Sequence, residues 1–271
     1  NNGLEFLLSY SNSNKAFKYN VSANLGTLKN EVLQIGADDL PIYGAASKTE
    51  VGRSVGEMFA YVADGIFQDQ AEVDASAFQS GAAPGDIKFM DVNNDNIIND
   101  DDRTYQGVTI PTYSYGFNFD SSYKNFDFSF FLQGAGGNKV FNTTYRELML
   151  GQYVNGHTDM LNYWTPQNTN TNIPRPIIGD PNANNRDSSR FIENGDYLKL
   201  QNIQLGYTIP LKDNKYINRA KVYVSGQNVF VITGYSGFDP DFSSDGLFSR
   251  GYERGSFPNP RTFALGVEID F

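Results

Sequence analysis

Residues 91–102 form the stretch whose side-chain types and spacing point most directly to chemistry. Oxygen-bearing side chains stand at the first, third, fifth, ninth and twelfth positions of this loop. They are Asp91, Asn93, Asp95, Asn99 and Asp102, and the backbone carbonyl of Ile97 falls at the seventh position. Ca²⁺ binds oxygen ligands at this spacing. The sequence therefore predicts a Ca²⁺ site made by these six residues, in which Asn99 acts through a water and Asp102 is bidentate.

Two positions of this acidic loop differ from the usual Ca²⁺ loop. Asn96 stands at the sixth position, where Gly is usual, and Asp102 stands at the twelfth, where Glu is usual. Asn tolerates the left-handed backbone that the sixth position needs. Ile98 is expected to pack inward. A solvated acidic turn is the alternative interpretation, and a bound ion is expected to stiffen the loop without taking part in a reaction.

Two further stretches could suggest an enzyme, but each lacks a required part. The glycines of residues 133–138 are followed by neither a crossover helix nor a Lys-Ser/Thr pair, so a flexible strand exit explains them better than a nucleotide site. His157, the single histidine, stands beside Thr158 and Asp159 without a nucleophile elbow. We interpret it as an exposed loop residue and expect no enzymatic activity.

The stretches discussed above must be held in place by regular elements. Seven segments of the sequence, in which apolar and polar residues alternate, are candidates for these elements. Alternation with a period of two predicts strands that have one apolar and one polar face. The last stretch places Phe263, Leu265, Val267, Ile269 and Phe271 on one face. The predicted strands are residues 3–10, 16–27, 112–121, 125–134, 197–209, 219–228 and 262–271.

The connections between these strands alternate between short and long. The short ones are residues 11–15, 122–124 and 210–218, and the long ones are residues 28–111, 135–196 and 229–261. Short turns on one side of a membrane and long loops on the other are the layout of an outer-membrane β-barrel. With the carboxyl terminus on the periplasmic side, every long connection is extracellular. A soluble or surface-exposed, Ca²⁺-stiffened β-sandwich binding module is the alternative, although it does not explain the alternation in loop length.

Composition narrows the class of protein further. The chain is 39% hydrophobic and 14% aromatic, which excludes a disordered chain. Its formal net charge of −10 argues against a nucleic-acid partner. No apolar run is long enough for a transmembrane helix, whereas a barrel strand turns only every second residue toward lipid. The chain has no cysteine, so disulfides and thiolate metal sites are excluded.

Seven strands do not close a bacterial single-chain barrel, which has an even number of strands and about eight at the least. We therefore expect an all-β fold in which residues 1–271 are the carboxyl-terminal portion of a larger transmembrane antiparallel barrel. Within it, residues 28–111 form a long extracellular loop region that contains the acidic loop. The remaining strands upstream, and any plug, are expected to lie outside these residues.

Several stretches carry a family resemblance. They are PGDIK at 84–88, DVN at 91–93, SRFIENGDYLKLQNIQLGY at 189–207, SGQN at 225–228 and PNPRTF at 258–263. In this order they resemble the carboxyl-terminal portion of SusC/RagA-type TonB-dependent transporters of Bacteroidetes. The acidic loop also resembles the version found in that family, where Gly is commoner at the sixth position.

The resemblance implies a plugged barrel of about 22 strands in the bacterial outer membrane. It also implies active import of oligosaccharides or oligopeptides. The implied partners are the remainder of the same transporter with its plug and N-terminal strands, a SusD/RagB-like surface lipoprotein, the TonB complex, the substrate and membrane lipid. This chain would supply barrel wall and extracellular loops.

Two groups of side chains are candidates for contact with a substrate or with the plug. Polar residues expected to face inward are Asn118, Asp120, Asp127, Ser129, Gln204 and Gln227. Aromatic residues of the long loops are Tyr153, Tyr163, Trp164, Tyr235, Phe238, Phe242, Phe248, Tyr252 and Phe257. The aromatic residues could stack on sugar rings or contact peptide side chains, or they could pack within the loops.

Overall fold

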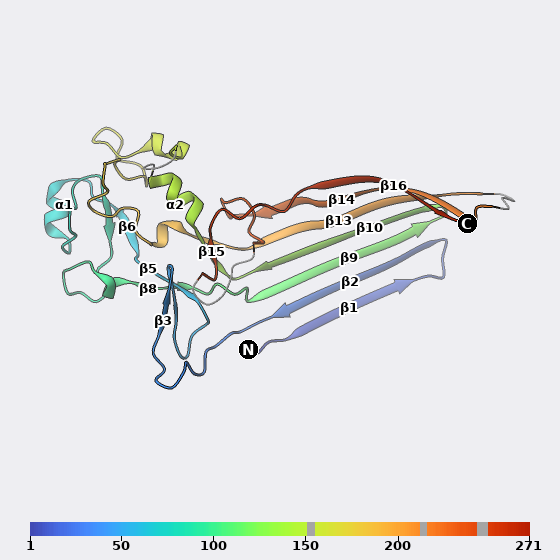
Figure 1. Ribbon diagram of the computed structural model, residues 1–271, viewed down its shortest axis with the longest axis horizontal. Helices are drawn as coiled ribbons and strands as arrows, with labels where there is room; N and C mark the ends of the chain where they lie inside the picture. The colour runs from blue at the N-terminus through green and yellow to red at the C-terminus, as the bar shows by residue number, and fades with distance from the viewer. Residues whose placement is uncertain (151–154, 212–215, 243–248) are drawn as a thin grey trace.

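The computed structural model describes residues 1–150, 155–211, 216–242 and 249–271. Its main element is an antiparallel sheet of seven strands whose spatial order is their order in the chain. The strands are β1 (Glu5–Asn12), β2 (Phe17–Thr27), β9 (Tyr113–Tyr123), β10 (Phe126–Gly136), β13 (Tyr197–Ile209), β14 (Arg219–Thr233) and β16 (Thr262–Asp270). Figure 1 shows these strands running side by side, with the long connections gathered at one end of the sheet and the chain terminus Phe271 near the other. All seven predicted strands and the all-β fold class are confirmed.

One face of this sheet is apolar across all seven strands. Residues directly opposite each other on neighbouring strands share a face. Tyr10 lies opposite Val21, Val21 opposite Phe119, Phe119 opposite Phe130, and Phe130 opposite Ile203. Large side chains of this face, such as Leu8, Leu205, Val224 and Leu265, are exposed to the surroundings. An exposed apolar face of this extent is typical of a surface that contacts lipid or another protein.

Two irregularities in the strands keep this apolar face continuous. The register of β13 against β14 shifts between Leu200 and Asn202, and Asn228 of β14 adopts a positive φ of 50°. Beyond the shift, Leu200 lies opposite Phe230, so apolar residues continue on the same face. The predicted strand 219–228 was therefore too short. Its alternation changes parity at the bulge, where a search for a period of two ends the strand.

Gly134 and Gly136 lie within β10 and Gly137 follows it, so the interpretation as a flexible strand exit was wrong for the first two glycines. A Cβ atom at Gly134 would lie 2.4 Å from Cζ of Tyr115, and one at Gly136 would lie 2.7 Å from Cζ of Tyr113. The two tyrosine rings stack with centroids 6.3 Å apart. The glycines therefore make room for aromatic rings near the loop end of the sheet, where a barrel has one of its aromatic girdles.

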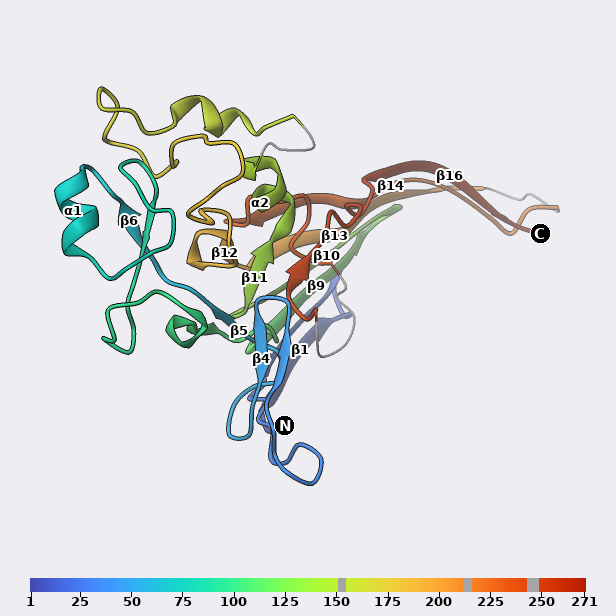
Figure 2. The same cartoon turned by 60° about the vertical axis from the view of Figure 1, so that its left-hand side comes forward.

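The three long connections together form a compact unit, which we call the loop assembly and define as the described residues of 28–112, 137–196 and 234–261. Figure 2 shows it projecting beyond the curved sheet. Its strands are β3 (Ile42–Gly44), β4 (Ser47–Thr49), β5 (Glu57–Ala60), β6 (Ala63–Ile66), β7 (Ile87–Phe89), β8 (Thr104–Gly107), β11 (Lys139–Asn142), β12 (Ile192–Asn194) and β15 (Tyr252–Glu253). Its helices are α1 (Gln70–Ala75) and α2 (Thr143–Leu150), with 3₁₀ turns η1 (Asp100–Asp102), η2 (Thr158–Asn162) and η3 (Ser189–Phe191).

The loop assembly has its own hydrophobic core, which is made of two clusters. One cluster contains Ala46, Met58, Phe141 and Phe191, and the other contains Ile66, Ile87, Phe89 and Trp164. The first cluster joins segments from two of the long connections. The long connections are therefore ordered structure, which the alternation pattern did not predict. Among the described residues, no helix has the length and apolar character needed to cross a membrane.

Candidate functional site

The acidic loop at the outer end of the molecule is organised by its own side chains. Asp91 accepts hydrogen bonds from the backbone N–H groups of Asn94 at 2.7 Å and Asn96 at 2.8 Å. Asn93 and Asp95 each accept from the N–H two residues further on, at 2.9 Å. Asn96 has a φ of 65°, as expected of the sixth position. Asp91, Asn93 and Asp95 are thus brought into one tight turn.

The end of the acidic loop returns to its beginning through Asp102. This carboxylate is fully buried and accepts 2.8 Å hydrogen bonds from the N–H groups of Val92 and Asn99. The side chain of Asn99 accepts from the N–H of Asp101 at 2.7 Å. Ile98 packs against the cluster that contains Trp164, which confirms its predicted inward position.

The donor set of this loop is made of oxygen atoms only, as Ca²⁺ chemistry requires. A carboxylate has about four lone-pair sites, so hydrogen bonds to N–H groups leave sites free for a cation. No three Asp, Glu, His or Cys side chains in the described part of the chain converge as a metal-binding group. The Ca²⁺ site of Asp91, Asn93, Asp95, Ile97, Asn99 and Asp102 therefore stays a prediction.

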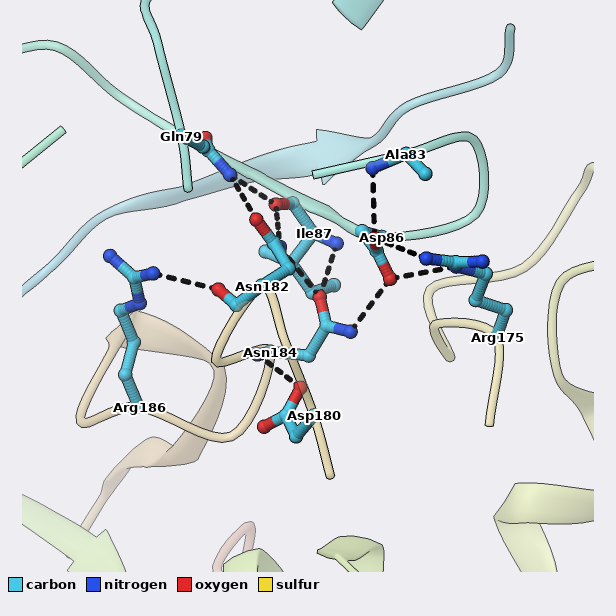
Figure 3. A network of polar contacts seen from close by, with 9 residues as sticks. All are labelled: Gln79, Ala83, Asp86, Ile87, Arg175, Asp180, Asn182, Asn184 and Arg186. Atoms are coloured by element: carbon cyan, nitrogen blue, oxygen red, sulfur yellow. Dashed lines mark hydrogen bonds and ion pairs between the residues drawn. The ribbon is translucent and has the colours of Figure 1, made fainter. Parts of the chain in front are cut away.

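A buried polar network behind the acidic loop connects two of the long connections (Figure 3). Its centre is Asp86, which is fully buried. Two hydrogen bonds of 2.9 Å join its carboxylate oxygens to Nε and one Nη of Arg175, 89 residues away in the chain. The carboxylate also accepts from the side-chain amide of Asn184 and the backbone N–H of Ala83, both at 2.9 Å. The contact with Asp86 raises the pKa of Arg175.

Amide side chains extend this network along β7. Asn184 accepts from the N–H of Ile87 at 2.7 Å, while Asn182 donates to the Ile87 carbonyl at 2.9 Å. Gln79 donates to Asn182 and to the same carbonyl (Figure 3). Buried polar groups are stabilising only when they have partners. The network therefore fixes the segment around residue 182 against β7. Sequence reasoning missed its role, because the partners are distant in the chain and show no periodicity.

The polar face of the sheet carries all six side chains predicted to face inward. Asp120 lies opposite Ser129, and Ser129 lies opposite Gln204. Asn118 donates to Asp120 within β9, and Gln227 shares this face through its register with β13. Asp127 forms a 2.8 Å ion pair with Lys221 across the intervening strand.

A glycine makes room for this ion pair. A Cβ atom at Gly206, which lies on the strand between the two charges, would be 2.4 Å from Cε of Lys221 and 2.5 Å from Oδ2 of Asp127. The polar face of the sheet, which lies opposite the apolar face, thus carries hydrogen-bonding groups and paired charges. This is the arrangement expected of the interior of a transport barrel.

The aromatic residues of the loops divide into buried and exposed groups. Trp164 and Tyr235 are buried, and Tyr252 stacks on Phe141 with ring centroids 4.9 Å apart, so these three pack within the loop assembly. Tyr163, Phe238 and Phe257 are exposed and Phe242 is half-buried. Tyr153 and Phe248 lie outside the described residues.

The contacts of His157 indicate a structural role. It is half-buried, accepts at Nδ1 from the N–H of Asp159 at the start of η2, and has its ring edge against Tyr145. These contacts explain the residue as a helix cap.

Comparison with known proteins identifies the family. No family model matches the chain. The chain is 33% identical over 290 residues to TonB-dependent receptor P3 of Formosa agariphila, an alignment that covers 100% of this chain and 28% of that receptor. It is 31% identical to TonB-dependent receptor P26 of the same organism, over 100% of this chain and 29% of that one. Over its whole length, this chain is homologous to a part of TonB-dependent receptors. It is also 27% identical to TonB-dependent receptor SusC of Bacteroides thetaiotaomicron, over 100% of this chain and 26% of SusC.

Comparison with solved structures shows that the fold is similar to that of a transporter. A structure of the RagAB peptide transporter matches with a TM-score of 0.78 at 21% identity, over 99% of this chain and 29% of that chain. The RagAB peptide importer in the "open-open" state matches with the same TM-score at 20% identity, over 99% of this chain and 28% of that chain. The seven-stranded sheet and its loops therefore share the fold of part of these transporter chains, and the β-sandwich alternative is set aside.

The chain spans less than a third of the length of the relatives it matches. Receptors of the SusC/RagA type are outer-membrane proteins, so the predicted location is confirmed. The relatives named here are receptors and a transporter rather than enzymes, in agreement with the expectation of no enzymatic activity.

Proposed function

We propose that this chain forms the carboxyl-terminal wall and outer loops of a TonB-dependent importer of oligosaccharides or oligopeptides. The observation that carries the proposal is the sheet, which has one continuous exposed apolar face and one polar face with paired charges. Such a wall separates lipid from an aqueous or plugged interior. The relation to SusC and the likeness to the RagAB peptide importer support it.

In this proposal the rest of the same transporter supplies the plug and the N-terminal strands. β1 and β16 lie at the two edges of the described sheet, and unpaired strand edges are the places where further strands would add. A TonB complex supplies the driving force through the plug. A SusD/RagB-like surface lipoprotein covers the loop assembly from outside. The RagAB importer, in which two states named "open-open" and "closed-closed" have been solved, supports a partner of this kind.

The ordered loop assembly gives this importer a preformed outer mouth. Its buried core and the Asp86–Arg175 pair hold the described parts of the long connections together. Preorganised loops lose less conformational entropy when a ligand binds. The substrate is therefore expected to bind against fixed walls. It would then pass along the polar inner face of the barrel.

Uptake by cells tests this function. A strain that lacks the full-length receptor is complemented with it, and entry of radiolabelled maltohexaose and of radiolabelled oligopeptides is measured with and without functional TonB. The proposal predicts that at least one substrate class enters only when both the receptor and TonB are present. Equal uptake without TonB, or no uptake of either class, would contradict it.

We also propose that the acidic loop binds Ca²⁺ and that the ion stiffens the loop. The tight turn of Asp91, Asn93 and Asp95 and the buried Asp102 support this proposal. Luminescence of Tb³⁺ bound to the full-length receptor, and its displacement by Ca²⁺, would measure the site. Asp95→Asn should weaken binding about tenfold or more, whereas Asp101→Asn, outside the ligand set, should not. Equal binding by both variants would contradict the assignment.

A further inference from the structure

The loop assembly contains a cavity of about 480 Å³ that is lined by Met149, Leu150, Met160 and Tyr163 and by residues between 173 and 190. This volume lies within the range of about 300–1,000 Å³ that is usual for small-molecule sites. The walls are held by backbone hydrogen bonds. The N–H of His157 donates to the carbonyl of Leu148 at 3.0 Å, and the N–H of Trp164 donates to the carbonyl of Ile173 at 2.9 Å. The cavity is therefore preformed.

The lining of the cavity is mostly apolar. Its principal apolar side chains are Met149, Met160, Tyr163, Ile173 and Ile177. At its edge Ile178 is fully exposed, although a large aliphatic side chain is usually at least partly covered. Methionine side chains are flexible and polarizable, so they adapt to apolar groups of different shape. The lining suits an apolar group more than a sugar, whose hydroxyls need several hydrogen-bonding partners.

Within the described residues, Arg175 is the charged group at the cavity that forms an ion pair, whereas Asp180 and Arg190 have hydrogen-bond partners. Arg175 is paired with Asp86, and the two carboxylate oxygens of Asp180 accept from the N–H groups of Asn184 and Asn185 at 2.7 Å and 3.0 Å. Arg190 donates to the carbonyl of Asn184 at 3.0 Å. Among the described residues, Arg190 has no carboxylate within ion-pair distance.

The environment of Arg190 favours an anionic partner. Its guanidinium lies 5.1 Å from the ring centroid of Phe191, which is fully buried. Burial lowers the pKa of the Arg190 guanidinium to about 10 because the charged form loses hydration, and the nearby Tyr145 and Asp180 offset only part of this effect. A guanidinium has five N–H donors and binds carboxylates with two parallel hydrogen bonds. Arg190 therefore retains donors for a ligand.

We propose that this cavity is a subsite for the carboxyl-terminal residue of an oligopeptide, with its apolar side chain between Met149 and Met160 and its carboxylate on Arg190. This assignment rests on the proposed import function and narrows the substrate to peptides. At the carboxyl terminus of a peptide, the side chain and the carboxylate are both bonded to the last Cα, so one residue offers an apolar group and an anion together. A neutral oligosaccharide supplies neither.

Binding of labelled peptides to the purified full-length receptor tests the subsite. The probes are Gly-Ser-Gly-Ser-Leu as the free acid, the same peptide as the carboxyl-terminal amide, Gly-Ser-Gly-Ser-Ser as the free acid, and maltohexaose. The free acid ending in Leu should bind about 10- to 100-fold more tightly than its amide. Arg190→Gln should reduce this ratio to about one. Arg254→Gln, an exposed arginine outside the cavity, should leave it unchanged.

A second variant tests the apolar wall. Met160→Ser should reduce the preference for terminal Leu over terminal Ser about tenfold, while the ratio of acid to amide stays high. A purely structural Arg190 would weaken acid and amide equally in Arg190→Gln and leave their ratio unchanged, and that result would overturn the proposal.

Equal binding of acid and amide to the unaltered receptor, or binding of maltohexaose alone, would also overturn the subsite. Import itself would then stand, because TonB-dependent uptake in cells is measured separately and without these peptides. Loss of all TonB-dependent uptake together with normal acid-specific binding would instead contradict the import function and leave the subsite in place.

Discussion

The sheet and the loop assembly solve the problem of stability in different ways. The sheet exposes its large apolar side chains, such as Leu205 and Val224, and has no core of its own on that face. The loop assembly buries its apolar side chains and also buries acidic side chains, including Asp86 and Glu253. The sheet therefore depends on lipid and on the rest of the barrel, whereas the loop assembly is held by contacts within itself.

Removing the buried carboxylate at the centre of the loop assembly should have the largest effect. Asp86→Ala leaves Arg175 without its bidentate partner and removes acceptors from Asn184 and Ala83. Loss of one member of a buried pair costs about 3–5 kcal/mol. We expect faster hydrogen exchange in β6 and β7 and protease cleavage of the long connections, while the barrel stays resistant to protease.

The matched control is Asp64→Asn. Asp64 is mostly exposed and its oxygen lies 3.6 Å from Nζ of Lys88. Exposed pairs contribute about 1 kcal/mol or less. Similar exchange rates in the two variants would mean that the loop assembly does not depend on the network around Asp86.

A charge on the apolar face of the sheet should be the next most damaging change. Leu205→Arg places a guanidinium among Phe128 and Val224, which lie opposite it on the neighbouring strands. In lipid this costs about 2–4 kcal/mol near the bilayer midplane. Gln204→Arg, the next residue, points to the other face and should cost clearly less. Denaturant unfolding of the full-length receptor in liposomes measures both, and equal costs would contradict the assignment of the two faces.

The glycine under the tyrosine stack marks the boundary between the two regions. Gly134→Ala would bring a Cβ to 2.4 Å from the carbonyl oxygen of Tyr197 and from the ring of Tyr115. Overpacking of this kind costs about 1–3 kcal/mol. Gly234→Ala is the control, because no atom lies within 4 Å of the added Cβ. The thermal unfolding temperature of Gly134→Ala should be lower than that of Gly234→Ala. Equal unfolding temperatures would contradict the tight packing of β10 at Gly134.

The smallest expected effect is a pH dependence confined to the loop assembly. Hydrogen bonds from the Gln68 N–H and from Lys88 lower the pKa of Glu72 below its ordinary value of 4.5. A lowered folded-state pKa means that the stabilisation is present above about 4.5 and is lost as the pH falls through the folded value. Hydrogen exchange in α1 should therefore rise below pH 4.5, and less so in Glu72→Gln. The same rise in hydrogen exchange below pH 4.5 in Glu72→Gln and in the unaltered receptor would contradict this prediction.

The strands could be predicted from the sequence because their signal is local. Alternation of apolar and polar residues sets each strand and its lipid face within about ten residues. The signal fails at Asn228, where a bulge reverses the parity of β14. It also does not predict the burial of Lys199, whose Nζ lies 2.8 Å from Asp241.

The loop assembly could be predicted only where a short motif determines the backbone. The spacing in the acidic loop anticipated the left-handed Asn96 and the inward Ile98. The contact between Asp86 and Arg175 spans 89 residues and has no period. The cavity around Arg190 likewise forms from segments whose proximity no local pattern records. Such contacts depend on the tertiary fold.

The central claim is that one face of the sheet contacts lipid and the other does not. The chain has no cysteine, so single fluorescent labels can be attached to Val224→Cys and Ser225→Cys in a full-length receptor whose other cysteines have been removed. In liposomes that contain brominated lipid, the label at position 224 should be strongly quenched and the label at position 225 should not. Equal quenching at both positions, or quenching at 225 alone, would contradict the account.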